Sequence, residues 1–167
     1  MPTDAAPPPL PDGPFDGRVA FDAHLRRAFD AAAQQGWREI VFSDPGFADW
    51  PLGERRSIDA LQAWAVSGRS LLLLAENFQV FDRSHARFVA WRRLWSHVVD
   101  ARACSGAGAP SVPSVILTPT WSLHRIDPER SRGVCSHQAD SRRALRERID
   151  ECLRHARPAF AATTLGL

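Results

Sequence analysis

Apolar residues in the first half of the chain form two short continuous runs, separated by a stretch with helical spacing. The runs are Glu39–Ser43 and Leu71–Ala75, and the helical stretch between them covers Ser57–Ser67 and stops at Gly68. The leucine run does not alternate with polar residues, which indicates a strand buried on both faces. The pattern therefore predicts a strand–helix–strand unit whose two strands are parallel and neighbouring.

The remaining pattern predicts further helices and strands on both sides of this unit. Helices are expected at 22–35, 84–97 and 140–157, strands at 18–21, 98–103 and 115–118, and a hairpin at 121–126 with 133–136. This order predicts an α/β fold, a layered sandwich with a central, mostly parallel sheet and helices on its faces. Residues 1–14 are predicted to be a disordered, proline-rich leader, residues 15–157 a single domain, and residues 158–167 a C-terminal tail.

Composition excludes several kinds of chemistry. All 21 basic residues are arginine, so reactions that need a lysine, such as Schiff-base formation or phosphate binding by a P-loop, are excluded. The three cysteines fit neither a disulfide framework nor a paired metal motif. Without an export signal or an apolar run of membrane-spanning length, we expect a cytoplasmic protein that does not enter a membrane.

Acidic and amide side chains follow both runs of the strand–helix–strand unit. Because ligands bind at the carboxyl ends of parallel strands, a candidate cleft is predicted there. Its residues are Asp44, Asp49, Trp50, Glu76, Asn77 and His124. The carboxylates could hold Mg²⁺, or Asp44 and Asp49 could cap turns while Glu76 pairs with an arginine. No residue is assigned as catalytic or as a metal ligand, and no cofactor is expected.

Arginines concentrate in the second half of the chain. Residues 1–82 hold 7 arginines and 12 acids, whereas residues 83–167 hold 14 and 7, so a basic surface is expected on the C-terminal elements. The candidate basic face comprises Arg83, Arg87, Arg92 and Arg93 on the predicted helix 84–97 and just before it. Such a face could bind the phosphates of a nucleic acid, or simply solvate the outside of a helix.

The order of elements over residues 18–157 resembles one half of a phospholipase D-like domain. Segments Ala75–Phe78 and Trp91–Trp95 also resemble short proteins of proteobacteria. The family's enzymes carry the motif H-x-K-x4-D, and here only His124 matches, with Ile126 at the lysine position and Ser131 at the aspartate position. The resemblance therefore implies a degenerate half-domain that lacks the family's activity.

These observations lead to a non-catalytic binding module as the first hypothesis for function. A protein partner is expected, with Phe47 and Trp50 either as exposed aromatic anchors or folded back onto the core as a local lid, and a homodimer is left open. The alternatives are a metal-dependent phosphoesterase that uses Asp44 and Glu76, and a nucleic-acid-binding protein that uses the arginine-rich helices.

Overall fold

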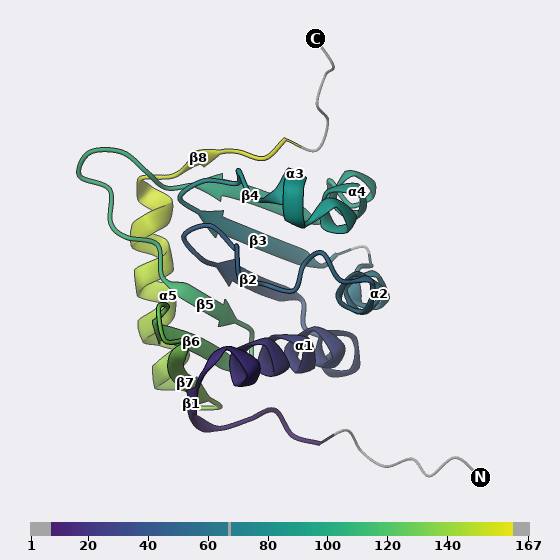
Figure 1. Ribbon diagram of the computed structural model, residues 1–167, viewed down its shortest axis with the longest axis vertical. Coiled ribbons are helices and arrows are strands. Elements are labelled where there is room, and N and C mark those ends of the chain that lie inside the picture. Colours follow the sequence, from purple (N-terminus) through teal and green to yellow (C-terminus); the bar gives the residue numbers. More distant parts are fainter. Residues whose placement is uncertain (1–7, 67, 162–167) are drawn as a thin grey trace.

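Eight strands form one sheet in the order β1-β7-β6-β5-β2-β3-β4-β8 (Figure 1). The computed structural model describes residues 8–66 and 68–161. The strands are β1 (Gly13–Asp16), β2 (Glu39–Ser43), β3 (Ser70–Ala75), β4 (Val99–Ala103), β5 (Ser114–Leu117), β6 (Ser122–Asp127), β7 (Arg132–Ser136) and β8 (Arg157–Pro158).

Helices cover both faces of this sheet. They are α1 (Arg18–Gln35), α2 (Arg55–Trp64), α3 (Phe81–Ser84), α4 (Ala86–Leu94) and α5 (Ala139–Arg154). In Figure 1, α1 to α4 lie on one side of the sheet and α5 lies alone on the other. The predicted helix 84–97 is shorter in the structure, α4 at 86–94, and the separate short helix α3 precedes it. The two helices meet at His85, where φ is −127° and ψ is 40°. Helix α1 ends as expected, because Gly36 takes the left-handed conformation with φ of 63°.

The predicted strand–helix–strand unit is confirmed. Strands β2 and β3 are parallel, with Ile40 opposite Leu71 and Phe42 opposite Leu73. Helix α2 provides the crossover, and its buried residues Leu61 and Trp64 pack onto the same core as these strands.

The prediction of a mostly parallel sheet is wrong. Of the seven strand pairings among the described residues, only β2 with β3 and β3 with β4 are parallel. The other five, β1–β7, β2–β5, β4–β8, β5–β6 and β6–β7, are antiparallel. A parallel return from β4 would need a crossover back to the strand starts. Residues 104–113 contain no helix and instead join the carboxyl end of β4 to β5.

That connection passes over the carboxyl ends of the two parallel strands. At its start the Cys104 N–H donates to the Ala75 carbonyl (2.8 Å), and at its end Ser43 Oγ donates to the Pro113 carbonyl (2.7 Å). The segment 105–113 therefore crosses the edge at which the candidate cleft was expected. As a result β5 enters the sheet beside β2 in the opposite direction.

Two hydrophobic clusters fill the space between the layers. The larger cluster lies between the sheet and helices α1, α2 and α4, and includes Phe21, Phe42 and Trp64. The smaller one lies under α5 and joins Leu145 and Ile149 to Val41 and other sheet residues. Burial on both faces explains why the central strands lack alternation.

Both ends of the domain differ from the predicted boundaries. Residues 18–21, predicted as a strand, are the first turn of α1, and the first strand is β1 at 13–16. Part of the predicted leader is also ordered, because Leu10 is buried and the Pro11 carbonyl accepts a hydrogen bond from Trp121 Nε1 (2.9 Å). Strand β8 lies partly in the predicted tail. Residues 1–7 and 162–167 lie outside the described residues.

Candidate functional site

Asp44, the first residue of the predicted cleft, is buried, and both of its carboxylate oxygens accept hydrogen bonds. It directly follows β2, and its Oδ2 accepts hydrogen bonds from the backbone N–H groups of Gly46 (3.1 Å) and Phe47 (2.8 Å). Its Oδ1 accepts a hydrogen bond from Arg125 Nη2 at 3.0 Å. Asp44 therefore caps its turn, which was one of the two sequence interpretations.

Arg125, on β6, fills the space beside Asp44. Its Nε donates to Ser114 Oγ (3.1 Å), and its Nη1 donates to Asp49 Oδ2 (3.1 Å) and Ser131 Oγ (3.4 Å). The guanidinium carbon lies 4.1 Å from the centre of the Phe21 ring. The side chain is only 3% exposed, so each nitrogen of a buried cation has a partner.

This network makes Asp44 and Asp49 internal partners of an arginine. A divalent cation at the same carboxylates would have to displace the guanidinium and leave Arg125 buried and unpaired. Asp49, whose side chain is 37% exposed, also accepts a hydrogen bond from Arg18 (3.2 Å). Within residues 8–66 and 68–161, no group of three or more His, Cys, Asp or Glu side chains is placed to hold a metal ion.

The two aromatic residues proposed as anchors are not on the surface. Phe47 and Trp50 are 0% and 2% exposed, and their rings pack together in an edge-to-face arrangement at 4.8 Å. Trp50 also contacts the rings of Phe21 (6.3 Å) and Phe42 (5.4 Å). The loop between β2 and α2 is thus part of the larger core, so the alternative in which the two rings fold back onto the core is confirmed and that of exposed anchors is wrong.

The other cleft residues do not converge on Asp44. Glu76 lies near it through the backbone, since its N–H donates to the Pro45 carbonyl (2.9 Å). Asn77 is exposed and caps the next turn through the N–H of Gln79 (3.2 Å). His124 points to the opposite face of the sheet from its neighbour Arg125, as residues adjacent in a strand do.

On that opposite face His124 meets helix α5. Its Nε2 lies 3.2 Å from Arg148 Nη1. Burial, and to a smaller extent the charge of Arg148, lower the pKa of His124. The imidazole is therefore neutral at pH 7 and accepts the hydrogen bond from the guanidinium.

The candidate basic face is interrupted. Arg83, Arg87 and Arg93 are exposed, and Arg87 donates to the Gly53 carbonyl (2.8 Å). Arg92 is only 7% exposed, and its Nε donates to the Phe160 carbonyl (3.1 Å). Burial lowers the pKa of Arg92. Arg92 therefore does not present its charge on the candidate basic face.

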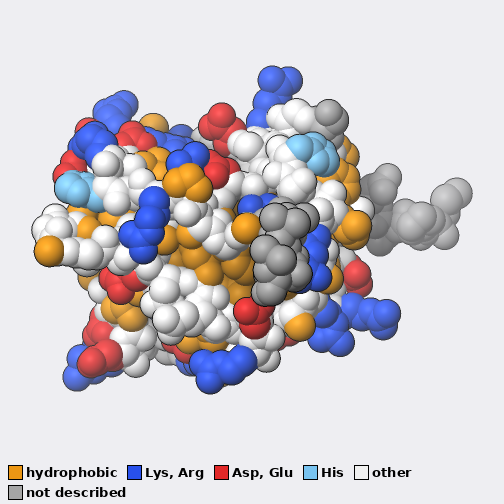
Figure 2. Space-filling view, turned by 90° about the horizontal axis from the view of Figure 1, so that it is seen from above, with side chains coloured by type: hydrophobic (Ala, Val, Ile, Leu, Met, Phe, Trp, Pro, Cys, Tyr) orange, Lys and Arg blue, Asp and Glu red, His pale blue; other side chains and the backbone are white. Residues whose placement is uncertain are grey.

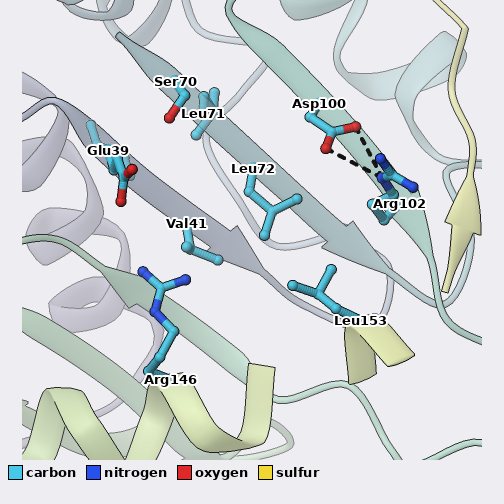
Figure 3. A pocket seen from close by; sticks show the side chains of 10 residues that line it. Glu39, Val41, Ser70, Leu71, Leu72, Asp100, Arg102, Arg146 and Leu153 are labelled. Carbon is cyan, nitrogen blue, oxygen red and sulfur yellow. Dashed lines mark hydrogen bonds and ion pairs between the residues drawn. The ribbon is translucent and has the colours of Figure 1, made fainter. Parts of the chain in front are cut away.

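A groove that the sequence did not indicate lies on the α5 side of the sheet. It has a volume of about 440 Å³ and lies where α5 leaves strands β2, β3 and β4 uncovered (Figure 3). Val41, Leu72 and Leu153 form its apolar surface. The polar side chains that line it are Glu39, Ser70, Asp100, Arg102 and Arg146.

The charged groups of this groove differ in how they are paired. Arg102 Nε donates to both carboxylate oxygens of Asp100, at 3.1 and 3.2 Å. Arg146 from α5 and Glu39 from β2 project into the groove from its two sides (Figure 3). Within residues 8–66 and 68–161, neither of these two side chains has a hydrogen bond or ion pair. The groove thus presents one available cation and one available anion beside an apolar surface.

Helix α5 carries arginines along its length as well. It contains five arginines and four acids, a net charge of +1. Arg143 pairs with Asp140 (3.2 Å) and Arg154 pairs with Glu151. These are the intrahelical pairs of a solvated surface. Over the described parts of the chain, no helix is long and apolar enough to cross a bilayer.

Comparison with known proteins gives a relationship in fold only. No protein-family model and no curated protein matches the chain. Among solved structures, the chain is similar to TrmBL2, an archaeal chromatin protein whose structure shows a novel mode of DNA binding. The TM-score is 0.66 at 13% identity, and the match covers 95% of this chain and 58% of TrmBL2. The present chain thus spans little more than half of that protein.

The comparisons do not test the resemblance to phospholipase D-like enzymes, which stays a prediction. The mostly parallel sheet that accompanied it is wrong, because five of the seven pairings are antiparallel. The sheet shared with TrmBL2 is the fold relationship that the comparisons support.

Proposed function

We propose that the protein is a non-catalytic binding domain and that the groove beside α5 is its ligand site. The observation that carries this proposal is the pair of unpartnered, oppositely charged side chains, Arg146 and Glu39, on two sides of an apolar surface. Concave sites with an apolar lining and a few polar groups are the usual form of small-molecule sites, and about 440 Å³ is within their range.

The ligand that fits this arrangement is a small zwitterion with an aliphatic body. Its anionic group would accept hydrogen bonds from the Arg146 guanidinium, a donor suited to carboxylates and phosphates. Its ammonium group would lie against Glu39, and its aliphatic part would cover Val41, Leu72 and Leu153. An aliphatic ω-amino acid, which carries its carboxylate and its ammonium at opposite ends of a hydrocarbon chain, is the simplest molecule of this class.

The hydrogen bonds made by the acids at the strand ends support the part of this proposal that excludes catalysis. A hydrolase of the kind considered from sequence would use Asp44 as a ligand to a metal ion. Asp44 instead has both oxygens engaged, by two backbone N–H groups and by Arg125.

A nuclear magnetic resonance titration tests the proposal. Aliphatic ω-amino acids should shift the backbone resonances of Val41 and Leu72, whereas carboxylic acids and amines of the same size should bind more weakly, because each satisfies only one of the two charges. The proposal fails if none of these compounds shifts the two resonances, or if the singly charged analogues bind equally well.

Nucleic-acid binding is a second candidate, supported by the fold shared with TrmBL2, a DNA-binding protein. Exposed arginines on α5, among them Arg143, would contact phosphates. The nearly equal number of acids on this helix weakens the charge argument. Binding of a DNA duplex that weakens steeply with salt, and weakens further in Arg143→Gln, would favour this candidate. Binding that is independent of salt would exclude it.

A further inference from the structure

The last described residues of the chain occupy the open edge of the sheet with little backbone pairing. Strand β8 has two residues, and Pro158 and Arg157 lie opposite Arg102 and Ala103 of β4. One further bond, from the Ala159 N–H to the Ala101 carbonyl (3.0 Å), continues the pairing. Without this segment, β4 would be an edge strand with unpaired backbone groups.

A single aromatic side chain anchors this segment. The Phe160 ring lies 5.3 Å from Phe78, 4.9 Å from Phe81 and 6.5 Å from Phe88, measured between ring centres. The Arg92 guanidinium carbon lies 5.7 Å from the centre of the same ring. We call the site formed by Phe78, Phe81, Phe88 and Arg92 the aromatic pocket.

Two features indicate that Phe160 does not satisfy this pocket fully. Its φ of 49° lies in the left-handed region, which is unfavourable for a bulky residue. Arg92 is 7% exposed, and its Nη1 is buried without a hydrogen-bond partner in the part of the chain that the structure describes. A buried guanidinium nitrogen without an acceptor is costly. The pocket thus offers a donor that its present occupant does not use.

The surroundings of the segment are apolar. Figure 2 looks at the molecule from the side on which β8 lies in Figure 1, and hydrophobic side chains gather in the middle of this face, with basic and acidic side chains around them. A bound segment would gain both backbone pairing along β4 and contact with this apolar area.

We infer that the edge of β4 and the aromatic pocket form a docking site for an extended peptide segment of another protein. The peptide would pair with β4 through its backbone, place an aromatic side chain in the pocket, and offer a carboxylate or carbonyl oxygen to Arg92 Nη1. Strand addition to an open edge, with a side-chain pocket for specificity, is an established mode of peptide recognition. Residues 157–161 are the internal occupant that such a peptide replaces.

This inference does not depend on the groove beside α5, because the aromatic pocket is built from α3, α4 and the residues before them. A second copy of this chain could present the same segment, and the test therefore includes the state of association.

The test uses a labelled peptide with the sequence of residues 155–161 and the full chain, as wild type and as Phe160→Ala. The peptide should bind Phe160→Ala about tenfold more tightly than wild type, because in wild type the internal segment competes for the site. A peptide with alanine in place of its phenylalanine is the control and should not bind. The inference is overturned if the two peptides bind equally, or if neither binds to a folded Phe160→Ala protein.

A second measurement on the wild type does not rely on that variant being folded. The Ala159 amide should exchange its hydrogen about 100-fold faster than the Ile149 amide of α5, because the segment opens without unfolding of the domain. Equal protection of the two amides would overturn the inference. Dimerisation that rises with concentration and is abolished by Phe160→Ala would also overturn it, in favour of exchange between two copies.

Discussion

Arg125 Nη2 lies 3.0 Å from Asp44 Oδ1, and both side chains are almost completely buried. The two residues are separated by 81 positions in the sequence and come from β6 and from the turn after β2. This ion pair joins the antiparallel half of the sheet to the parallel unit. It also decides how the acidic strand ends should be interpreted, because the guanidinium occupies the space that a metal ion would need.

We predict that Asp44→Asn strongly destabilises the fold. The substitution leaves Arg125 buried beside a neutral amide, and removing one partner of a buried ion pair costs about 3–5 kcal/mol. Urea denaturation of wild type and variant measures this loss. Asp16→Asn, which breaks the exposed pair with Arg132, is the matched control and should leave the free energy of unfolding nearly unchanged.

A double variant separates the charge effect from the loss of hydrogen bonds. Asp44→Asn combined with Arg125→Met removes the unpaired charge, and we expect it to be less destabilised than Asp44→Asn alone. If the single variant unfolds at the wild-type urea concentration, the ion pair is not the central contact of this region.

Trp50→Ala should destabilise the fold. The indole is 2% exposed and packs on three aromatic rings, so its truncation should cost about 3–5 kcal/mol. Thermal melting provides the measurement, with Val19→Ala, at a position 85% exposed, as the control. A Trp50→Ala protein that melts like wild type would contradict the buried position of this indole.

Divalent metal ions should not stabilise the protein through the strand-end acids. A site filled at 100 times its dissociation constant would raise the free energy of unfolding by about 2.7 kcal/mol. Because Asp44 pairs with Arg125, and Asp49 pairs with both Arg125 and Arg18, we expect no change in melting temperature when Mg²⁺ or Mn²⁺ is added. A saturable increase that Asp49→Asn abolishes would contradict this account.

The buried cysteines should make the fold sensitive to alkali. Desolvation raises the pKa of Cys135 from 9.0 to about 12 and that of Cys152 to about 11. The folded state therefore favours the neutral thiols. Their contribution is present in full below pH 9, where the thiols of the unfolded chain are also protonated, and is lost as pH rises towards the folded-state values.

Urea denaturation at several pH values measures the size of this effect and identifies its origin. Each thiol should reduce the free energy of unfolding by about 1.4 kcal/mol per pH unit within its window. The chain has no lysine and no tyrosine, so few other groups titrate there. Urea denaturation between pH 9 and 11 should show this slope in wild type, and Cys135→Ala with Cys152→Ala should lose most of it. An unchanged slope in the double variant would rule out the thiols as the cause.

Local patterns predicted the centre of the fold because both strands and their crossover are continuous in the sequence. The leucine run identifies β3, and β2 with β3 is parallel as expected. Helix α2 ends at Trp64, several residues before Gly68, where the pattern predicted its end. The direction of β5 could not be predicted in this way, because it depends on how residues 104–113 cross the strand ends. Segment 105–113 is rich in glycine and proline, which indicates a loop but not its path.

The sequence does contain a signal for the partner of Asp44. Leu123 and Arg125 are two positions apart in the predicted hairpin strand, so they face the same side of the sheet. An arginine on a buried face needs an acidic partner, and Asp44 was an acid without one. No pattern in the sequence indicates the groove beside α5, because the groove is formed by the position at which α5 packs on the sheet.

The central claim, that the groove beside α5 binds a small zwitterion, is tested most directly by calorimetric titration of three proteins with one aliphatic ω-amino acid. Wild type and Arg143→Gln should bind with the same affinity, because Arg143 lies on the same helix outside the groove and pairs with Asp140. Arg146→Gln should bind at least about tenfold more weakly, since a charged hydrogen bond contributes about 1.5–3 kcal/mol. Equal binding by all three proteins, or binding by none, would contradict the account.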